Sequence, residues 1–192
     1  ALHDLGVTSN NIANARTTGF KKRQATFADI YGQTESVKTS GARIGMGALT
    51  VENRLMSEQG SLQQTGDVLD LAIEGQGMFT LVDAARPDEK LYTRDGSFTV
   101  NNEGLIANAD GMQLMSALGA AITVPMTANT ATTVNGAETF TEAPLTGVAI
   151  RNDGRVEATY GKNNTFFVGQ IGLANFADPN RLTPIGQNYF KE

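Results

Sequence analysis

Mostly apolar positions follow a helical spacing at the start of the chain. Leu2, Leu5, Ser9 and Ile12 recur at intervals of three, four and three residues, which is the seam of an amphipathic or coiled-coil helix. No N-cap precedes this pattern, so we expect the end of a longer helix. The helix should stop in the Asn and Thr cluster that follows, and Gly19 should take a left-handed conformation that turns the chain.

From about residue 41 the pattern changes to short apolar or alternating runs separated by turn signals. Tight turns are marked by Asp-Gly or Asn-Gly dipeptides at 95–96, 110–111, 135–136 and 153–154. The runs between them predict strands or hairpins at 69–82, 91–100 and 147–160, and a strand buried on both faces at 165–176. We therefore expect an antiparallel sandwich or barrel-like domain.

Residues 125–144 interrupt this β pattern. They hold few large apolar side chains and are rich in Thr and Ala, so we expect an extended connection or excursion there. The whole chain is then mainly β with a short N-terminal helix. Its two parts are a helix end with a connecting joint over residues 1–40 and an antiparallel β domain over residues 41–192.

Composition narrows the classes of function. The chain has 192 residues and no cysteine, which removes thiolate nucleophiles, thiolate metal sites and disulfides together. The formal net charge of −5 argues against a nucleic-acid binder, because phosphate binding needs a surplus of Lys and Arg on one face. The basic cluster of Lys21, Lys22 and Arg23 is interpreted as a solvated turn.

Candidate chemistry is sparse. His3 is the only histidine and lies on the helix fragment, far in sequence from any Ser or Asp that might complete a triad. Asp67, Asp70 and Glu74 lie close together, but the last two alternate with apolar residues, as on the polar face of a half-buried strand. We expect no catalytic residues, no metal site, no cofactor and no small-molecule substrate.

Four ordered blocks of sequence carry a family resemblance. The first, "SNNIANARTTGFKK", closely resembles a signature near the N-terminus of bacterial flagellar axial proteins, which include rod and hook subunits. The second, "QGSLQQTGDVLDLAIEGQGMF", is similar to another segment of that family. The blocks lie at 9–22, 59–79, 92–114 and 168–190. They span nearly the whole chain, so the resemblance to this family is specific.

The resemblance implies a structural subunit that assembles with copies of itself and with neighbouring axial proteins into a tube. N- and C-terminal helices would pair as a coiled coil lining the tube, with the β domain outside. The first two blocks are then expected to form the joint and to face neighbouring subunits. The candidate joint and interface residues are Asn10, Asn11, Asn14, Thr18, Gly19, Phe20, Lys21, Leu62, Gln63 and Thr65.

Compared with the family pattern, most of the inner helix before Ala1 and the C-terminal heptad helix are missing, so we expect a trimmed core that is monomeric in isolation. The resemblance implies a location in the bacterial flagellum, either the extracellular hook or the rod spanning the periplasm, and export without a cleaved signal peptide.

Two subunit types fit the resemblance. Only about thirty residues separate Met115 from Gly147, which favours a rod-type or minimal hook-type subunit. The amino-acid sequences of 27–32 and 168–186, in contrast, look more like those of the hook protein. We favour the hook type narrowly over the distal rod type. If the 125–144 stretch is the site of a missing outer domain, the native chain is longer there. A different class stays open as well, an extracellular β-sandwich module that binds glycans or a cell surface, although the chain lacks the Trp platforms of such modules.

Overall fold

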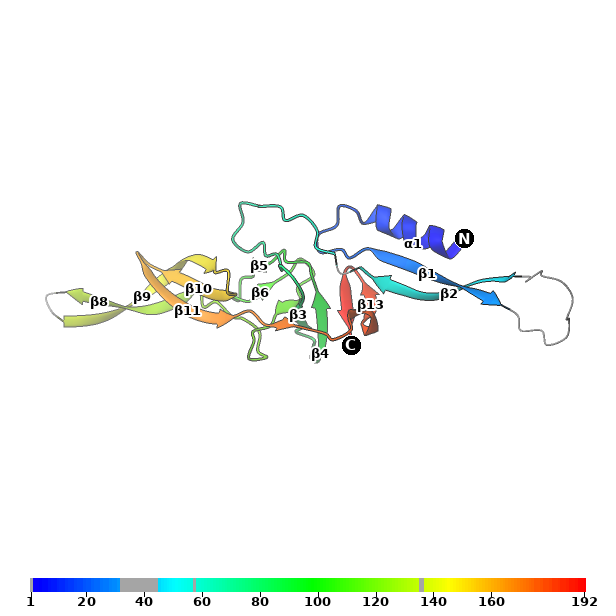
Figure 1. Ribbon diagram of the computed structural model, residues 1–192. Helices are drawn as coiled ribbons and strands as arrows, with labels where there is room; N and C mark the ends of the chain where they lie inside the picture. The colour runs from blue at the N-terminus through cyan, green and yellow to red at the C-terminus, as the bar shows by residue number, and fades with distance from the viewer. Residues whose placement is uncertain (1, 32–44, 57, 135–136) are drawn as a thin grey trace, which may run out of the picture.

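A computed structural model describes residues 2–31, 45–56, 58–134 and 137–192. The molecule is elongated, with one hairpin projecting at each end (Figure 1). The fold is mainly antiparallel β with one short α-helix, which confirms the expected fold class. Within the described residues, no helix is long and apolar enough to cross a membrane.

One end of the molecule combines the helix with a two-stranded sheet. The helix α1 (Leu2–Ala13) confirms the predicted helix and lies along β1 (Arg23–Tyr31), which pairs antiparallel with β2 (Gly45–Leu55) (Figure 1). Leu5 and Ile12 on α1 are 64% and 71% exposed, so this seam is not covered within the subunit. The expected boundary near residue 41 lies outside the described residues, and the division into two parts stays a prediction.

The central body contains an eight-stranded antiparallel sheet. Its order is β13-β14-β4-β3-β7-β6-β5, with β12 paired to β3, so the C-terminal hairpin lies next to strands from the middle of the chain. A 3-10 helix, η1 (Pro179–Arg181), precedes that hairpin. The strands are β3 (Met78–Asp83), β4 (Arg86–Thr93), β5 (Thr99–Val100), β6 (Ile106–Ala107), β7 (Gln113–Leu114), β12 (Leu173–Ala174), β13 (Thr183–Gly186) and β14 (Tyr189–Lys191).

A four-stranded antiparallel sheet forms the other end, in the order β11-β10-β9-β8. Its strands are β8 (Thr127–Val134), β9 (Ala137–Ile150), β10 (Arg155–Tyr160) and β11 (Asn164–Gln170). Residues 125–144, expected to be an extended connection or excursion, contain β8 and the first half of β9, which pair as a hairpin. The low apolar content of this stretch gave no strand pattern in the sequence. Its Thr residues nevertheless favour strands, even where little surface is buried.

The main core lies between these two sheets. Phe79 is 3% exposed and meets Phe98 edge to face at a centroid distance of 5.3 Å, while Val156 and Tyr160 of β10 join the same cluster from the other sheet. The Tyr160 hydroxyl donates to the carbonyl oxygen of Pro125 at 2.8 Å, so its polar end is satisfied. A second, smaller cluster lies on the opposite face of β3 and β4 and contains Met78, Tyr92, Leu182 and Phe190.

Two local expectations were wrong. The strand expected to be buried on both faces, β11, lies at the sheet edge, and its Phe166 and Phe167 are 43% and 56% exposed. Periodicity marks a run as apolar, but it does not say how many strands lie beside it. The run at 69–82 is regular strand only from Met78. The segment before it forms one bridge, Asp70 to Ser97, and then turns at Gly75 and Gly77, whose φ values are +91° and +119°.

Candidate functional site

The predicted Asn and Thr cluster ends α1 through hydrogen bonds within one turn. The carbonyl oxygen of Asn10 accepts from the Asn14 amide at 3.1 Å and from the Asn14 side-chain amide at 2.9 Å. The Thr17 hydroxyl donates to the Asn14 side-chain oxygen at 3.3 Å, and the Thr17 amide donates to the Asn14 carbonyl at 3.0 Å. These bonds satisfy groups that a helix end leaves open, so the cluster is a C-terminal cap.

Asn11 has a different task from its neighbours. Its side-chain nitrogen donates to the Arg23 carbonyl oxygen at 2.8 Å, and its side-chain oxygen accepts from the Arg23 amide at 3.0 Å. A side-chain amide thus uses both its donor and its acceptor on the backbone of the first residue of β1. The helix and the strand are clasped together by one residue.

Gly19 seats the joint on the central body. Its φ of +67° confirms the expected left-handed conformation, and a Cβ at this position would stand 2.5 Å from both the carbonyl carbon of Arg94 and the amide nitrogen of Asp95. The Asn188 side-chain amide also donates to the Thr18 carbonyl oxygen at 3.0 Å. Only glycine permits so close an approach of two backbones, so this contact depends on both the conformation and the missing side chain.

The two lysines after the joint both contact Glu58 and remain partly exposed to solvent. The Lys21 ammonium donates to the Glu58 carbonyl oxygen at 2.7 Å, and Lys22 forms an ion pair with the Glu58 carboxylate at 2.5 Å. Burial, followed by the nearby Arg94 guanidinium, lowers the pKa of Lys21. The Lys22 hydrogen bond lowers the pKa of Glu58. Because the ion pair is largely exposed, it orients the chain more than it stabilises the fold.

The C-terminal hairpin supplies site residues that the sequence analysis missed. The Tyr189 hydroxyl donates to the Asp110 carboxylate and accepts from the Asn108 side-chain amide at 2.6 Å. Burial raises the pKa of Tyr189, and the hydrogen bond to Asp110 raises it further. Gln187 and Asn188 both have positive φ, at 47° and 60°, and form the turn between β13 and β14. An Asn in a two-residue turn was the one local signal for this site.

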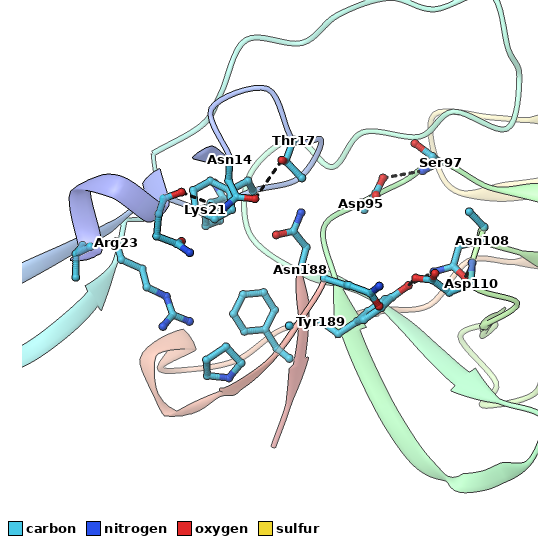
Figure 2. Close-up of a pocket in the computed structure, with 18 of the residues that line it drawn as sticks. Asn14, Thr17, Lys21, Arg23, Asp95, Ser97, Asn108, Asp110, Asn188 and Tyr189 are labelled. Atoms are coloured by element: carbon cyan, nitrogen blue, oxygen red, sulfur yellow. Dashed lines mark hydrogen bonds between the residues drawn. The ribbon is translucent and has the colours of Figure 1, made fainter. Parts of the chain in front are cut away.

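A groove of about 780 Å³ separates α1 and the joint from this hairpin. Figure 2 shows Asn14 and Lys21 on one side of the groove and Asn188, Tyr189 and Asp110 on the other. Four of the predicted site residues contribute to its lining, namely Asn10, Asn14, Phe20 and Lys21.

The remaining predicted residues are placed differently. Asn11 and Gly19 hold structural contacts, and Thr18 acts through its carbonyl oxygen. Leu62, Gln63 and Thr65 are exposed in the irregular segment 58–68 and are not among the residues lining the groove. Leu62 is 59% exposed, which is high for a large apolar side chain. The structure thus brings the first block together as a joint and leaves residues 62–65 of the second block open to solvent.

Within the part of the chain that the structure describes, no group of three or more His, Cys, Asp or Glu side chains lies close enough to hold a metal ion. The groove instead presents amides and hydroxyls together with the Lys21 ammonium, the Arg23 guanidinium and the carboxylates of Asp95 and Asp110. Those groups are suited to hydrogen bonding with backbone or side-chain amides.

Sequence comparison gives matches along the chain. Residues 72–158 match the family described as "Flagellar hook protein FlgE/F/G D1 domain", and residues 4–21 match "Flagella basal body rod protein". The flagellar basal-body rod protein FlgG of Agrobacterium fabrum is 34% identical, covering 98% of this chain and 68% of the relative. The FlgG protein of Bacillus subtilis is 32% identical, covering 98% and 67%. The flagellar hook protein FlgE of Helicobacter mustelae is 37% identical over 56% of this chain and 26% of the relative.

These similarities decide between the classes considered from the sequence. The matched proteins are structural rod and hook proteins, so the chain is not an enzyme, and a glycan-binding module receives no support. The matches cover both the joint at 4–21 and much of the β body at 72–158. The chain belongs to the family of bacterial flagellar rod and hook proteins, the axial structural proteins of the flagellum.

Proposed function

We propose that this protein is a distal rod subunit of the flagellar basal body and assembles with copies of itself into a tube that transmits torque. The proposal depends on how much of this chain aligns with each kind of relative. The two FlgG rod proteins align with 98% of the chain, joint and both sheets included, whereas the hook protein aligns with 56%. The sequences of short segments alone favoured the hook type narrowly; we now favour the rod type.

The joint supports this function through its geometry. Asn11 ties α1 to β1, and Gly19 with the Asn188 amide seats the joint on the β body. A subunit in a tube must hold its inner helix and its outer domain at one angle while load passes between them. Two backbones in contact at Gly19 resist a change of that angle, because no flexible side chain lies between them.

Neighbouring subunits are the partners that the exposed surfaces favour. Leu5 and Ile12 form an uncovered apolar seam on α1, and Leu62 is exposed in segment 58–68. Burying such side chains is favourable by about 1.5–3 kcal/mol each. We propose that Asn10, together with Gln63 and Thr65 beside Leu62, contacts the next subunit, and that adjoining axial proteins meet the same surfaces at the ends of the rod.

Placement in the flagellum tests the proposal. Cells expressing the tagged full-length protein in place of their own rod subunit would be examined by immunogold electron microscopy of isolated basal bodies with hooks attached. We expect label on the rod, within the span of the periplasm, and motile cells. Label confined to the curved hook would establish the hook type instead. The mature protein should keep its own N-terminal residues, since we propose export without a cleaved signal peptide.

A further inference from the structure

The four-stranded sheet has two edge strands that hold neither charge nor proline. Its order places β11 at one edge and β8 at the other. The sequence of β8 is TANTATTV and that of β11 is NTFFVGQ, so neither holds a charged residue or a proline. Natural proteins normally guard an exposed edge with charge, proline or a bulge, because its open backbone groups pair with other strands. Of these devices, β11 has only a register irregularity opposite Val156 and Glu157.

Aromatic side chains add to the exposed surface of this sheet. Phe140 on β9 is 71% exposed and pairs across the ladder with Ala131 of β8. Phe167 on β11 is 56% exposed, under the Arg155 guanidinium at 4.9 Å from the ring centroid. Ala143, three residues from Phe140, packs in the core, so the alternation of a strand puts Phe140 on the outer face. Each edge of the sheet therefore has a largely exposed aromatic ring nearby.

The strand directions at the two edges of the sheet allow antiparallel pairing between two copies of the chain. All neighbours in the sheet are antiparallel, so the four strands alternate in direction and β8 runs opposite to β11. A second copy placed beside the first in the same orientation therefore presents its β8 antiparallel to β11. Subunits of a tube share one orientation along its axis, so lateral neighbours meet in this way without any reversal.

We propose that β11 of one subunit pairs antiparallel with β8 of a second copy, which continues the four-stranded sheet from subunit to subunit. The inference rests on the proposed assembly into a tube. A second copy fits better than an unrelated protein because each chain offers both halves of the contact, at edges of similar length. Such a head-to-tail contact closes into a ring or propagates as a helix.

The pairing also predicts an offset between neighbours. Residues 137–144 of β9 pair with β8, whereas residues 145–150 pair with β10, which carries β11 on its far side. The two edges are thus displaced along the strands by about seven residues, or roughly 23 Å at the rise of a strand. Joining them shifts each copy along the strand direction, so the contact favours a helical tube over a flat ring.

Engineered cysteines test the contact in the assembled full-length protein. The chain has no cysteine of its own, so a pair introduced by Ala131→Cys and Thr165→Cys is the only pair within these residues. Both positions are exposed, and antiparallel pairing of the two strand centres brings them to adjacent sites on the outer face. Isolated basal bodies would be treated with a short bismaleimide and examined on denaturing gels. We expect a ladder of dimers, trimers and longer products.

Matched variants separate this contact from chance collisions. The single substitutions should stop at the dimer or remain monomeric, and the pair Asp88→Cys with Thr165→Cys, which places one thiol on exposed β4, should give no ladder. A second pair of variants uses charge. Ala131→Lys with Thr165→Lys should lose most assembled protein, while Ala131→Lys with Thr165→Glu should restore it, because like charges repel across a ladder.

The outcomes distinguish the contact from the function on which it rests. Rods of normal appearance without a ladder would overturn the edge pairing and leave the rod assignment standing. A ladder of equal strength in the Asp88 control would also overturn it. If the unmodified full-length protein enters no axial tube, the proposed function fails and this contact fails with it.

Discussion

Replacing Gly19 with alanine tests whether the joint is seated on the β body. Gly19 has a φ of +67°, and an added Cβ would lie 2.5 Å from the Arg94 carbonyl carbon and from the Asp95 amide nitrogen. Both contacts are with backbone atoms, so rotating a side chain cannot relieve them. The joint must move away from the body, or the body must distort.

Two separate costs set the size of the effect. A residue with a Cβ in the left-handed region costs about 1 kcal/mol. Overpacking against fixed atoms adds about 1–3 kcal/mol. The seated state should therefore lose about 2–4 kcal/mol relative to the unseated one. Because 1.4 kcal/mol is a factor of ten, the unseated fraction should rise roughly thirtyfold or more.

Hydrogen exchange of a group that is bonded across the seat measures this fraction directly. The informative group is the Asn188 side-chain amide, which donates to the Thr18 carbonyl oxygen at 3.0 Å and is released when the joint leaves the body. Gly111→Ala is the matched control, because its φ is +80° but nothing lies within 4 Å of the added Cβ. Exchange of the Asn188 side-chain amide within about twofold of the wild-type rate in Gly19→Ala would show that this seating is wrong.

Three further changes have distinct outcomes. Asn11→Ala removes two hydrogen bonds to the Arg23 backbone, so hydrogen exchange of the Arg23 amide should become faster, with a protection free energy lower by about 1–3 kcal/mol. Asn14→Ala, whose bonds stay within one turn, should leave the exchange rate of that amide nearly unchanged. Tyr189 has a pKa raised by burial above its ordinary 10.0, so its contribution to stability is complete below about pH 10 and is lost as pH rises further; Tyr189→Phe should flatten this alkaline decline in urea titrations. Phe79→Ala should lower the free energy of unfolding by about 3–5 kcal/mol, and a loss under 1 kcal/mol in calorimetry would contradict its place in the core.

Local signals in the sequence predicted the joint well. The spacing of Leu2, Leu5 and Ile12 indicated α1, and the Asn and Thr cluster with Gly19 indicated where it ends and turns. Each of these features depends on residues within a few positions of one another, whose conformational preferences the sequence carries directly.

Long-range contacts were beyond the same reasoning. The partner of Thr18 is Asn188, 170 residues away, and the seat of Gly19 is the backbone of Arg94, which has no side-chain signature. Burial of β11 was misjudged for a related reason. An apolar run predicts a strand, but its exposure depends on whether another strand lies beside it, which is a property of the topology.

The closed base of the β1–β2 hairpin has a mechanical consequence. The clasped residue Arg23 pairs with Leu55, and the next link outward is the Met56 amide to the Lys22 carbonyl at 3.0 Å. The chain from the helix and the chain to the body therefore both join this hairpin at its base. Tension between helix and body would break the hydrogen bonds of the ladder one at a time, starting with the bond between the Met56 amide and the Lys22 carbonyl. While that link holds, the ladder beyond it carries no tension, and the hairpin is a side branch of the load path.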